Sequence, residues 1–255
     1  MESILALEDG RIFRGRTFGA HAERDGEVVF NTAMTGYQEI LTDPSYRGQI
    51  LCMTCPEMGN YGINADDVES AIPHVQSMIV RALSPTPSNW RATQDLHQYL
   101  TQHGVPGMTE VDTRALTRHL RTRGSLRGVV SCLDRDVESL VRKAREAAPL
   151  EQRDLVGAVT RASAGRWTRP RDAAWREPAV GVAPDARPLR CVAFDFGTKN
   201  NIHRLLVESG FELILLPAHA SVDDVLGESP DAVFLSNGPG DPAVLTSIVA
   251  TVRDL

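Results

Sequence analysis

The octapeptide RCVAFDFG, residues 190–197, sets the architecture of the C-terminal part of this chain. Its mostly apolar run predicts a buried strand, and residues 200–209 predict the helix that follows it. Further strands are expected at 211–216 and 232–235, each reached through a helical stretch, and residues 243–255 again have helical character. Strands separated by helices predict right-handed crossovers and a parallel sheet. The expected class for this part is α/β.

Three parallel strands with an exposed edge make a poor independent domain. Because the helical segment at 243–255 is the last one given, we expect the sequence to stop before this sheet is complete.

Residues 1–150 do not show this regular alternation of strands and helices, and the class expected for them is α+β. Segments 4–7 and 12–18 flank the turn at Glu8-Asp9-Gly10 and predict a β-hairpin. Leu116 and Leu120 are four residues apart, as on one face of a helix. Further strands are predicted at 27–32 and 49–54, a short helix and turn at 35–45, and helices at 93–102, 113–123 and 139–147.

Residues 151–188 are predicted to be a structured linker. The stretch 162–188 contains four prolines and shows no sustained periodicity. Proline without Gly/Ser repetition is typical of a semi-rigid connection rather than a flexible tether. The predicted organisation is therefore an N-terminal domain at 1–150, this linker, and a partial domain at 189–255.

Composition limits the function classes. A chain of 255 residues with 42% hydrophobic residues can form one or two domains with ordinary cores. The net charge is −6 and Lys and Arg are scattered, so the sequence shows no cluster of basic residues of the kind that binds nucleic acid. No apolar run approaches the roughly 20 residues of a membrane span, and the N-terminus lacks the features of a signal peptide. We expect no nucleic-acid or membrane partner, and the cytoplasm as the compartment.

Cysteine, histidine and acidic side chains favour structural roles. Cys52 and Cys55 have the CxxC spacing of zinc and redox sites, but they lie in a strand-like apolar stretch without a second ligand pair. Cys132 and Cys191 also lie in strand-like runs, and no cysteine occupies a Gly-x-Cys-x-Gly nucleophile elbow. The seven histidines form no HxH or HExxH pair, so no metal site is expected. The acid pairs at 66–67 and 223–224 are expected at helix starts.

Two loops carry more information. The loop SNGPGDP, residues 236–242, follows a predicted strand at the end where parallel sheets place ligand sites. Its glycines flank a proline, which fixes the turn and leaves the N–H groups of Gly238 and Gly240 approachable by a carboxylate or an oxyanion. The loop LTDPSY, residues 41–46, offers the Ser45 hydroxyl beside a proline-fixed turn, which alone indicates only a helix stop.

Several motifs in fixed order make the whole chain resemble the small subunit of carbamoyl-phosphate synthase. The N-terminal domain of that family is matched by FNTAMTGYQEILTDPSY at 30–46, GNYG at 59–62, SNW at 88–90 and DTRALT at 112–117. The opening of its class I glutamine amidotransferase domain is matched by FDFGTKNNI at 194–202 and LSNGPGDP at 235–242.

This resemblance implies a subunit that hydrolyses glutamine and passes ammonia to a large subunit. The large subunit would make carbamoyl phosphate from bicarbonate, ammonia and ATP for arginine and pyrimidine biosynthesis. Ser45, Gly238 and Gly240 match the family's glutamine-binding positions. No cofactor is implied for this chain, whereas ATP and Mg are expected in the large subunit. The family's cysteine, histidine and glutamate triad would lie beyond Leu255, so no catalytic residue is assigned.

Three hypotheses follow. The sequence is part of a glutamine-hydrolysing ligase subunit, or it is a non-catalytic module that docks on the large subunit. The third and weaker hypothesis is a free-standing α+β ligand-binding protein. Coding sequence that continues past residue 255 into a nucleophile elbow would favour the first hypothesis, and a stop codon there the second.

Overall fold

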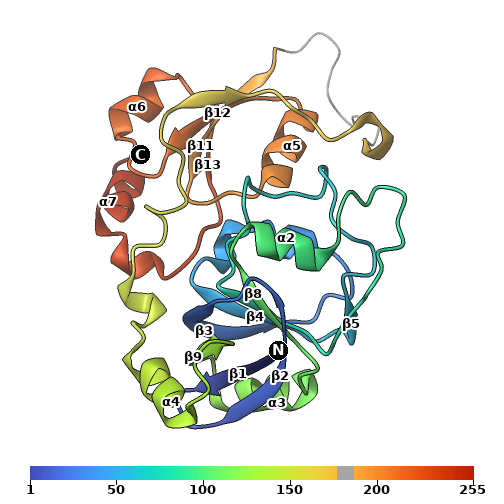
Figure 1. Cartoon of the computed structure of the whole chain (residues 1–255). Coiled ribbons are helices and arrows are strands. Elements are labelled where there is room, and N and C mark those ends of the chain that lie inside the picture. Colours follow the sequence, from blue (N-terminus) through green and yellow to red (C-terminus); the bar gives the residue numbers. More distant parts are fainter. Residues whose placement is uncertain (177–186) are drawn as a thin grey trace. The chain divides into compact units, whose positions relative to one another are not determined.

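The computed structural model describes residues 1–176 and 187–255, which form two compact units, Met1–Leu150 and Glu151–Leu255 (Figure 1). Each unit is described by itself below.

The first unit is built on a closed β-barrel. Its strands follow one another around the barrel in the order β1-β2-β8-β6-β4-β3-β9, and β9 pairs back onto β1. The neighbours β3–β4, β4–β6 and β6–β8 are parallel, and the other pairs are antiparallel. Closure leaves the sheet without a free edge. The strands are β1 (Glu2–Leu7), β2 (Ile12–Gly19), β3 (Glu23–Asn31), β4 (Gln49–Met53), β6 (Ser77–Ile79), β8 (Pro106–Thr109) and β9 (Leu126–Ser131), with a separate parallel pair, β5 (Glu57–Met58) and β7 (Ala82–Leu83).

An apolar cluster fills the barrel interior, and every strand of the barrel contributes to it. Helix α3 (Thr113–Arg123) adds Leu116 and Leu120 to this cluster. Burial of each such side chain stabilises the fold by roughly 1.5–3 kcal/mol. The strand residues are Leu5, Leu7, Phe13, Val28, Ile50, Cys52, Ile79, Met108 and Val130.

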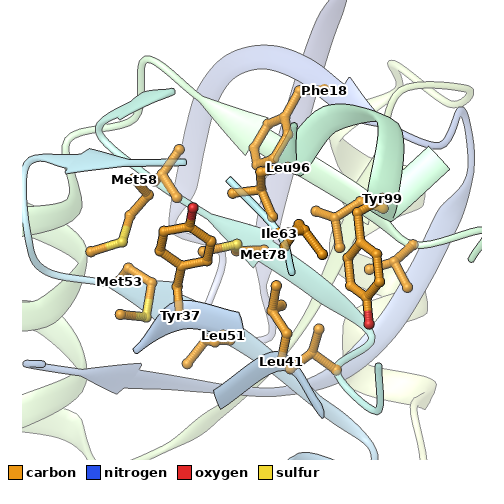
Figure 2. Close-up of a cluster of buried hydrophobic side chains, with 14 residues drawn as sticks. Phe18, Tyr37, Leu41, Leu51, Met53, Met58, Ile63, Met78, Leu96 and Tyr99 are labelled. Atoms are coloured by element: carbon orange, nitrogen blue, oxygen red, sulfur yellow. The ribbon is translucent and has the colours of Figure 1, made fainter. Parts of the chain in front are cut away.

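Helices cover the outside of the barrel. On β1, Ile4 and Ala6 point away from the interior and pack with Leu140 and Ala144 of α4 (Val137–Glu146). A second external cluster lies where α1 (Tyr37–Thr42) and α2 (Leu96–Gln102) pack over the strands (Figure 2). Strand β4 is therefore buried on both faces, which explains the unbroken apolar run at residues 50–53. The external cluster contains Tyr37, Leu41, Leu51, Met53, Met58, Met78, Leu96 and Tyr99.

The second unit is a four-stranded sheet in the order β10-β12-β11-β13. The three strands β12, β11 and β13 are parallel, and β10 pairs antiparallel with β12. Helix α6 packs on one face of the sheet through Val225, and α5 packs on the other through Leu206 and Val207. The elements are η2 (Leu150–Gln152), β10 (Gly165–Trp167), η3 (Ala173–Trp175), β11 (Leu189–Asp195), α5 (Asn200–Glu208), β12 (Phe211–Pro217), α6 (Val222–Gly227), β13 (Ala232–Leu235), η4 (Pro242–Val244) and α7 (Thr246–Asp254).

The expected fold class is confirmed: a mixed α and β unit precedes a partial parallel sheet. The hairpin of β1 and β2 and helix α3 lie where the sequence predicts them. The linker predicted at 151–188 contains strand β10, and part of it, 177–186, lies outside the described residues. The helix start expected at residues 66–67 is wrong, because these residues lie in a loop; the pair at 223–224 does begin a helix, α6.

Candidate functional site

The Asp-Pro-Ser turn of the first unit joins α1 to the short 3-10 helix η1 (Pro44–Tyr46). Asp43 ends α1 and its carboxylate accepts the backbone N–H of Ser45 at 2.9 Å. Pro44 occupies the first position of the new turn, where a missing N–H costs nothing. Ser45 is half-buried. The local sequence therefore fixes the backbone that carries the Ser45 hydroxyl.

The start of α1 is held by an aromatic residue from a distant loop. The hydroxyl oxygen of Tyr61 accepts the N–H groups of Gly36 at 2.8 Å and Tyr37 at 2.7 Å, so it satisfies two donors that a helix start leaves open. The rings of Tyr37 and Tyr61 stack with centroids 4.1 Å apart. The buried Tyr37 hydroxyl donates to the carbonyl of Gly62 at 2.6 Å. The motif at 59–62 thus clamps the helix that leads to Ser45.

Two buried polar side chains of α1 fix its other faces. The Gln38 amide donates to the carbonyl of Asn64 at 2.6 Å and accepts the N–H of Asn64 at 2.9 Å. The Thr42 hydroxyl accepts the N–H of Glu69 at 2.9 Å. Burial first, and then the nearby acidic side chains, raise the pKa of Glu39, whose buried Oε2 has no hydrogen-bond partner among the described residues.

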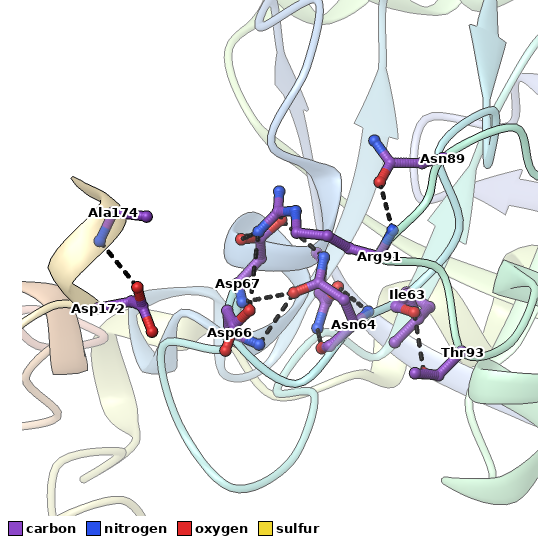
Figure 3. A network of polar contacts seen from close by, with 10 residues as sticks. Ile63, Asn64, Asp66, Asp67, Asn89, Arg91, Thr93, Asp172 and Ala174 are labelled. Carbon is purple, nitrogen blue, oxygen red and sulfur yellow. Dashed lines mark hydrogen bonds and ion pairs between the residues drawn. The ribbon is translucent and has the colours of Figure 1, made fainter.

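The loop beside α1 is organised by an ion pair (Figure 3). Arg91 donates to both carboxylate oxygens of Asp67, at 2.8 and 3.0 Å. Asn64 accepts the N–H groups of Asp66 and Asp67 on its side-chain oxygen and donates to the Asp67 carboxylate. Both charged side chains are about four-fifths buried, so the bidentate pair is protected from solvent. Arg91 directly follows the SNW motif at 88–90. Its ion pair with Asp67 therefore connects this motif to the loop that contains Asn64.

In the second unit, the loop at 236–242 lies against the loop that follows β11. Because β11 and β13 are parallel neighbours, both loops leave the sheet at the same edge. The Ser236 hydroxyl accepts the N–H of Phe196 at 2.9 Å, and the Asn237 amide donates to the carbonyl of Gly197 at 3.3 Å. The Asp195 carboxylate accepts the N–H of Gly197 at 3.0 Å. The two motifs form one hydrogen-bonded structure.

The glycines of this loop are required for different reasons. A Cβ on Gly238 would lie 2.4 Å from the carbonyl oxygen of Phe196. A Cβ on Gly240 would make only ordinary contacts, the nearest at 3.7 Å, but this residue adopts φ +79°, which disfavours a side chain. Both glycines are exposed, and within residues 1–176 and 187–255 neither N–H has a hydrogen-bond acceptor. These two N–H groups can therefore donate hydrogen bonds to an anionic oxygen.

Burial disfavours the thiolate form of two of the cysteines. Burial raises the pKa of Cys52 to about 12 and also raises that of Cys191. Cys52 lies in the barrel interior, whereas Cys55 packs beside the external cluster, so the CxxC residues belong to different clusters. Across the described parts of the chain, no group of three or more His, Cys, Asp or Glu is placed to hold a metal, and no helix is long and apolar enough to cross a membrane.

The predicted site residues lie in different units. Ser45 belongs to the first unit, and Gly238 and Gly240 belong to the second. Their convergence on one ligand stays a prediction. Sequence reasoning gave no role to Tyr61, Gln38 or Arg91. Their partners are 24 to 26 residues away in the chain, and no local periodicity indicates such contacts.

The comparisons with known proteins first define the class of the second unit. Residues 192–255 match the family described as glutamine amidotransferase class-I. The match begins within β11 and includes the Gly238 loop. Among solved structures, an aminopeptidase from Aneurinibacillus sp. strain AM-1 is similar only at a TM-score of 0.29 and 11% identity, over 89% of this chain and 51% of that one, which says nothing about fold.

Residues 5–130 match the CPSase domain of the carbamoyl-phosphate synthase small chain. The carbamoyl phosphate synthase small chain of Nitratidesulfovibrio vulgaris (strain DSM 19637 / Miyazaki F) is 49% identical, over 99% of this chain and 68% of its own length. Those of Syntrophotalea carbinolica and Nostoc sp. (strain PCC 7120) are 49% and 46% identical, over 100% of this chain and 67% and 66% of theirs. The chain belongs to the carbamoyl-phosphate synthase small chain family.

Proposed function

We propose that this chain is the glutamine-binding part of a carbamoyl-phosphate synthase small subunit, and that it docks on a large subunit. The observation that carries the proposal is the 49% identity over both units, since a glutamine amidotransferase relationship alone would not explain the barrel at 1–150. The large subunit would bind ATP and Mg and make carbamoyl phosphate from bicarbonate and ammonia. The product would supply arginine and pyrimidine biosynthesis in the cytoplasm.

Glutamine recognition would divide between two loops. The Ser45 hydroxyl, on its turn fixed by Asp43, would bind the amino-acid end of glutamine. The N–H groups of Gly238 and Gly240 would receive an anionic oxygen of the substrate or of the tetrahedral intermediate. Hydrogen bonds to charged groups contribute about 1.5–3 kcal/mol each, so loss of one donor would weaken binding at least tenfold.

A polypeptide of these 255 residues alone would not hydrolyse glutamine. The reaction needs a thiolate and a base that generates it. Cys52 and Cys191 are protonated thiols in apolar surroundings, and neither begins a helix after a sharp turn. The nucleophile of the family would come from sequence that follows Leu255 in a whole small subunit.

Two measurements test the proposal. Sedimentation velocity of this polypeptide mixed with the large subunit from the same organism should show a 1:1 complex. In the same mixture, carbamoyl phosphate should form from free ammonia and not from glutamine. Absence of a complex would refute the docking role. Product formed from glutamine, and lost when Cys52, Cys55, Cys132 or Cys191 is replaced by alanine, would refute the assignment of the nucleophile. The four alanine variants serve as matched controls for one another.

A further inference from the structure

A hollow of about 360 Å³ lies between helix α3 and the turn that joins β1 to β2. It is far along the chain from both proposed glutamine loops and has no part in the function proposed above. Its size falls within the range of small-molecule sites, about 300–1,000 Å³. The lining residues are Arg11, Ala115, Arg118, His119, Thr122 and Arg123.

Three of the residues that line the hollow are arginines. Arg11, Arg118 and Arg123 form no ion pair with any carboxylate in the part of the chain that the structure describes. The carboxylate of Asp9 lies beside them and already contacts His119 Nε2 at 2.7 Å and the backbone N–H of Arg11 at 3.0 Å. Partial burial alone would raise the pKa of Asp9, but these hydrogen bonds hold it below its usual range. Three arginines therefore line the hollow beside a carboxylate that already has other partners, in a chain whose net charge is −6.

The arrangement is fixed by the fold. Positions 115, 118, 119, 122 and 123 recur at the three- and four-residue spacing that places side chains on one helix face. Ala115 packs against the barrel cluster and gives the hollow an apolar floor. The Arg11 guanidinium lies 5.3 Å from the centroid of the Phe13 ring, which orients it by a cation–π contact. Less side-chain entropy is then lost when a ligand binds.

We propose that this hollow is a binding site for a small phosphate-bearing anion. Arginine guanidinium groups match phosphate oxygens with paired hydrogen bonds, and three arginines line this hollow. The limited volume of the hollow, about 360 Å³, favours a small molecule over an extended acidic peptide, and the net negative charge of the chain disfavours nucleic acid. Occupancy of this site would place a ligand on the helix that packs into the barrel.

The test is isothermal titration calorimetry of the chain with inorganic pyrophosphate at low ionic strength. We expect saturable binding with a Kd of about 1 mM or tighter. Arg118→Gln and Arg123→Gln should each raise the Kd about tenfold, which corresponds to about 1.4 kcal/mol. Arg121→Gln is the matched control, because Arg121 is exposed on the same helix and does not line the hollow. It should leave the Kd within a factor of two or so of the unchanged chain.

Two outcomes would overturn the proposal. One is the absence of saturable binding, or a loss of affinity in Arg121→Gln as large as in Arg118→Gln, which would indicate general charge attraction. The other is tighter binding of a hexaglutamate peptide than of pyrophosphate, with the same dependence on Arg118, which would make the hollow a protein contact. Shifts of the His119 ring resonances on adding pyrophosphate, measured by NMR, locate the bound anion independently of the variants.

Discussion

Replacement of Gly238 by alanine should deform the loop that we propose to bind glutamine. The new Cβ would lie 2.4 Å from the carbonyl oxygen and 3.0 Å from the Cβ of Phe196. The first of these atoms belongs to the backbone, so no side-chain rotation can relieve the contact. The loop after β13 must then move away from the loop after β11, and the hydrogen bond from the Phe196 N–H to the Ser236 hydroxyl, 2.9 Å long, should lengthen or break.

The magnitude follows from these contacts. Overpacking of a well-fitted site usually costs about 1–3 kcal/mol, and loss of one hydrogen bond about 1 kcal/mol. We therefore expect Gly238→Ala to reduce the free energy of unfolding by about 2–4 kcal/mol. Gly227, in α6 of the same unit, is the matched control, because no atom lies within 4 Å of its added Cβ and its φ is not positive. Gly227→Ala should be neutral or stabilising by about 0.5 kcal/mol.

The assay is urea unfolding of the full chain, followed by tryptophan fluorescence, to which Trp167 of β10 contributes from the apolar cluster of the second unit. Amide hydrogen exchange at Phe196 reports the loop contact directly. Equal stability of Gly238→Ala and the unchanged chain, with unchanged exchange at Phe196, would refute the steric argument. A Gly227→Ala variant destabilised as strongly as Gly238→Ala would show that any added methyl group disturbs this unit.

Three further predictions concern buried polar groups. Burial lowers the pKa of His203 to about 4, below the ordinary value near 6.5. The free energy of unfolding should therefore be highest above pH 6.5 and should fall by up to about 3 kcal/mol toward pH 4, because the unfolded chain binds the proton first. His203→Gln should flatten this pH dependence in urea titrations, and an unchanged dependence would contradict the argument. Tyr37→Phe should cost about 1–3 kcal/mol in thermal unfolding, because the buried carbonyl of Gly62 loses its donor. Tyr99→Phe should cost little, because the Tyr99 hydroxyl makes no hydrogen bond among the described residues. Arg91→Lys should lower the free energy of unfolding by about 1 kcal/mol, since lysine cannot reproduce the paired hydrogen bonds to Asp67. Equal stability of the variant would show that a single positive charge beside Asp67 is enough.

The parallel strands β11, β12 and β13 of the second unit, and the helices between them, could be predicted because their signals are local. Each strand is a short apolar run, and each helix follows within a few residues. The barrel of the first unit could not be predicted in this way. Strand β8 contains Pro106 and Gly107, which are rare in strands, and β6 is only three residues long. Closure also depends on the pairing of β1 with β9, about 125 residues apart along the chain, which periodicity does not report.

The candidate site shows the same division. The turn at Ser45 could be read from Asp43 and Pro44, since a capping carboxylate and a proline act on their immediate neighbours. The clamp formed by Tyr61 could not, because its two acceptor contacts reach back to the start of α1. The acidic residues at 66–67 were misread for a related reason. Their charges pair with Arg91, a long-range partner, rather than with a helix start.

The Gly238 loop and the loop that begins at Asp195 were recognised as separate motifs, and the structure explains why they occur together. Ser236 and Asn237 bind the backbone of the β11 loop, and the absence of a side chain at Gly238 lets the two backbones approach. A change in either loop would therefore be felt by both. The N–H groups of Gly238 and Gly240 can be aimed at a substrate oxygen only while this contact holds, so the residues that follow Asp195 act as positioning residues for the proposed glutamine site.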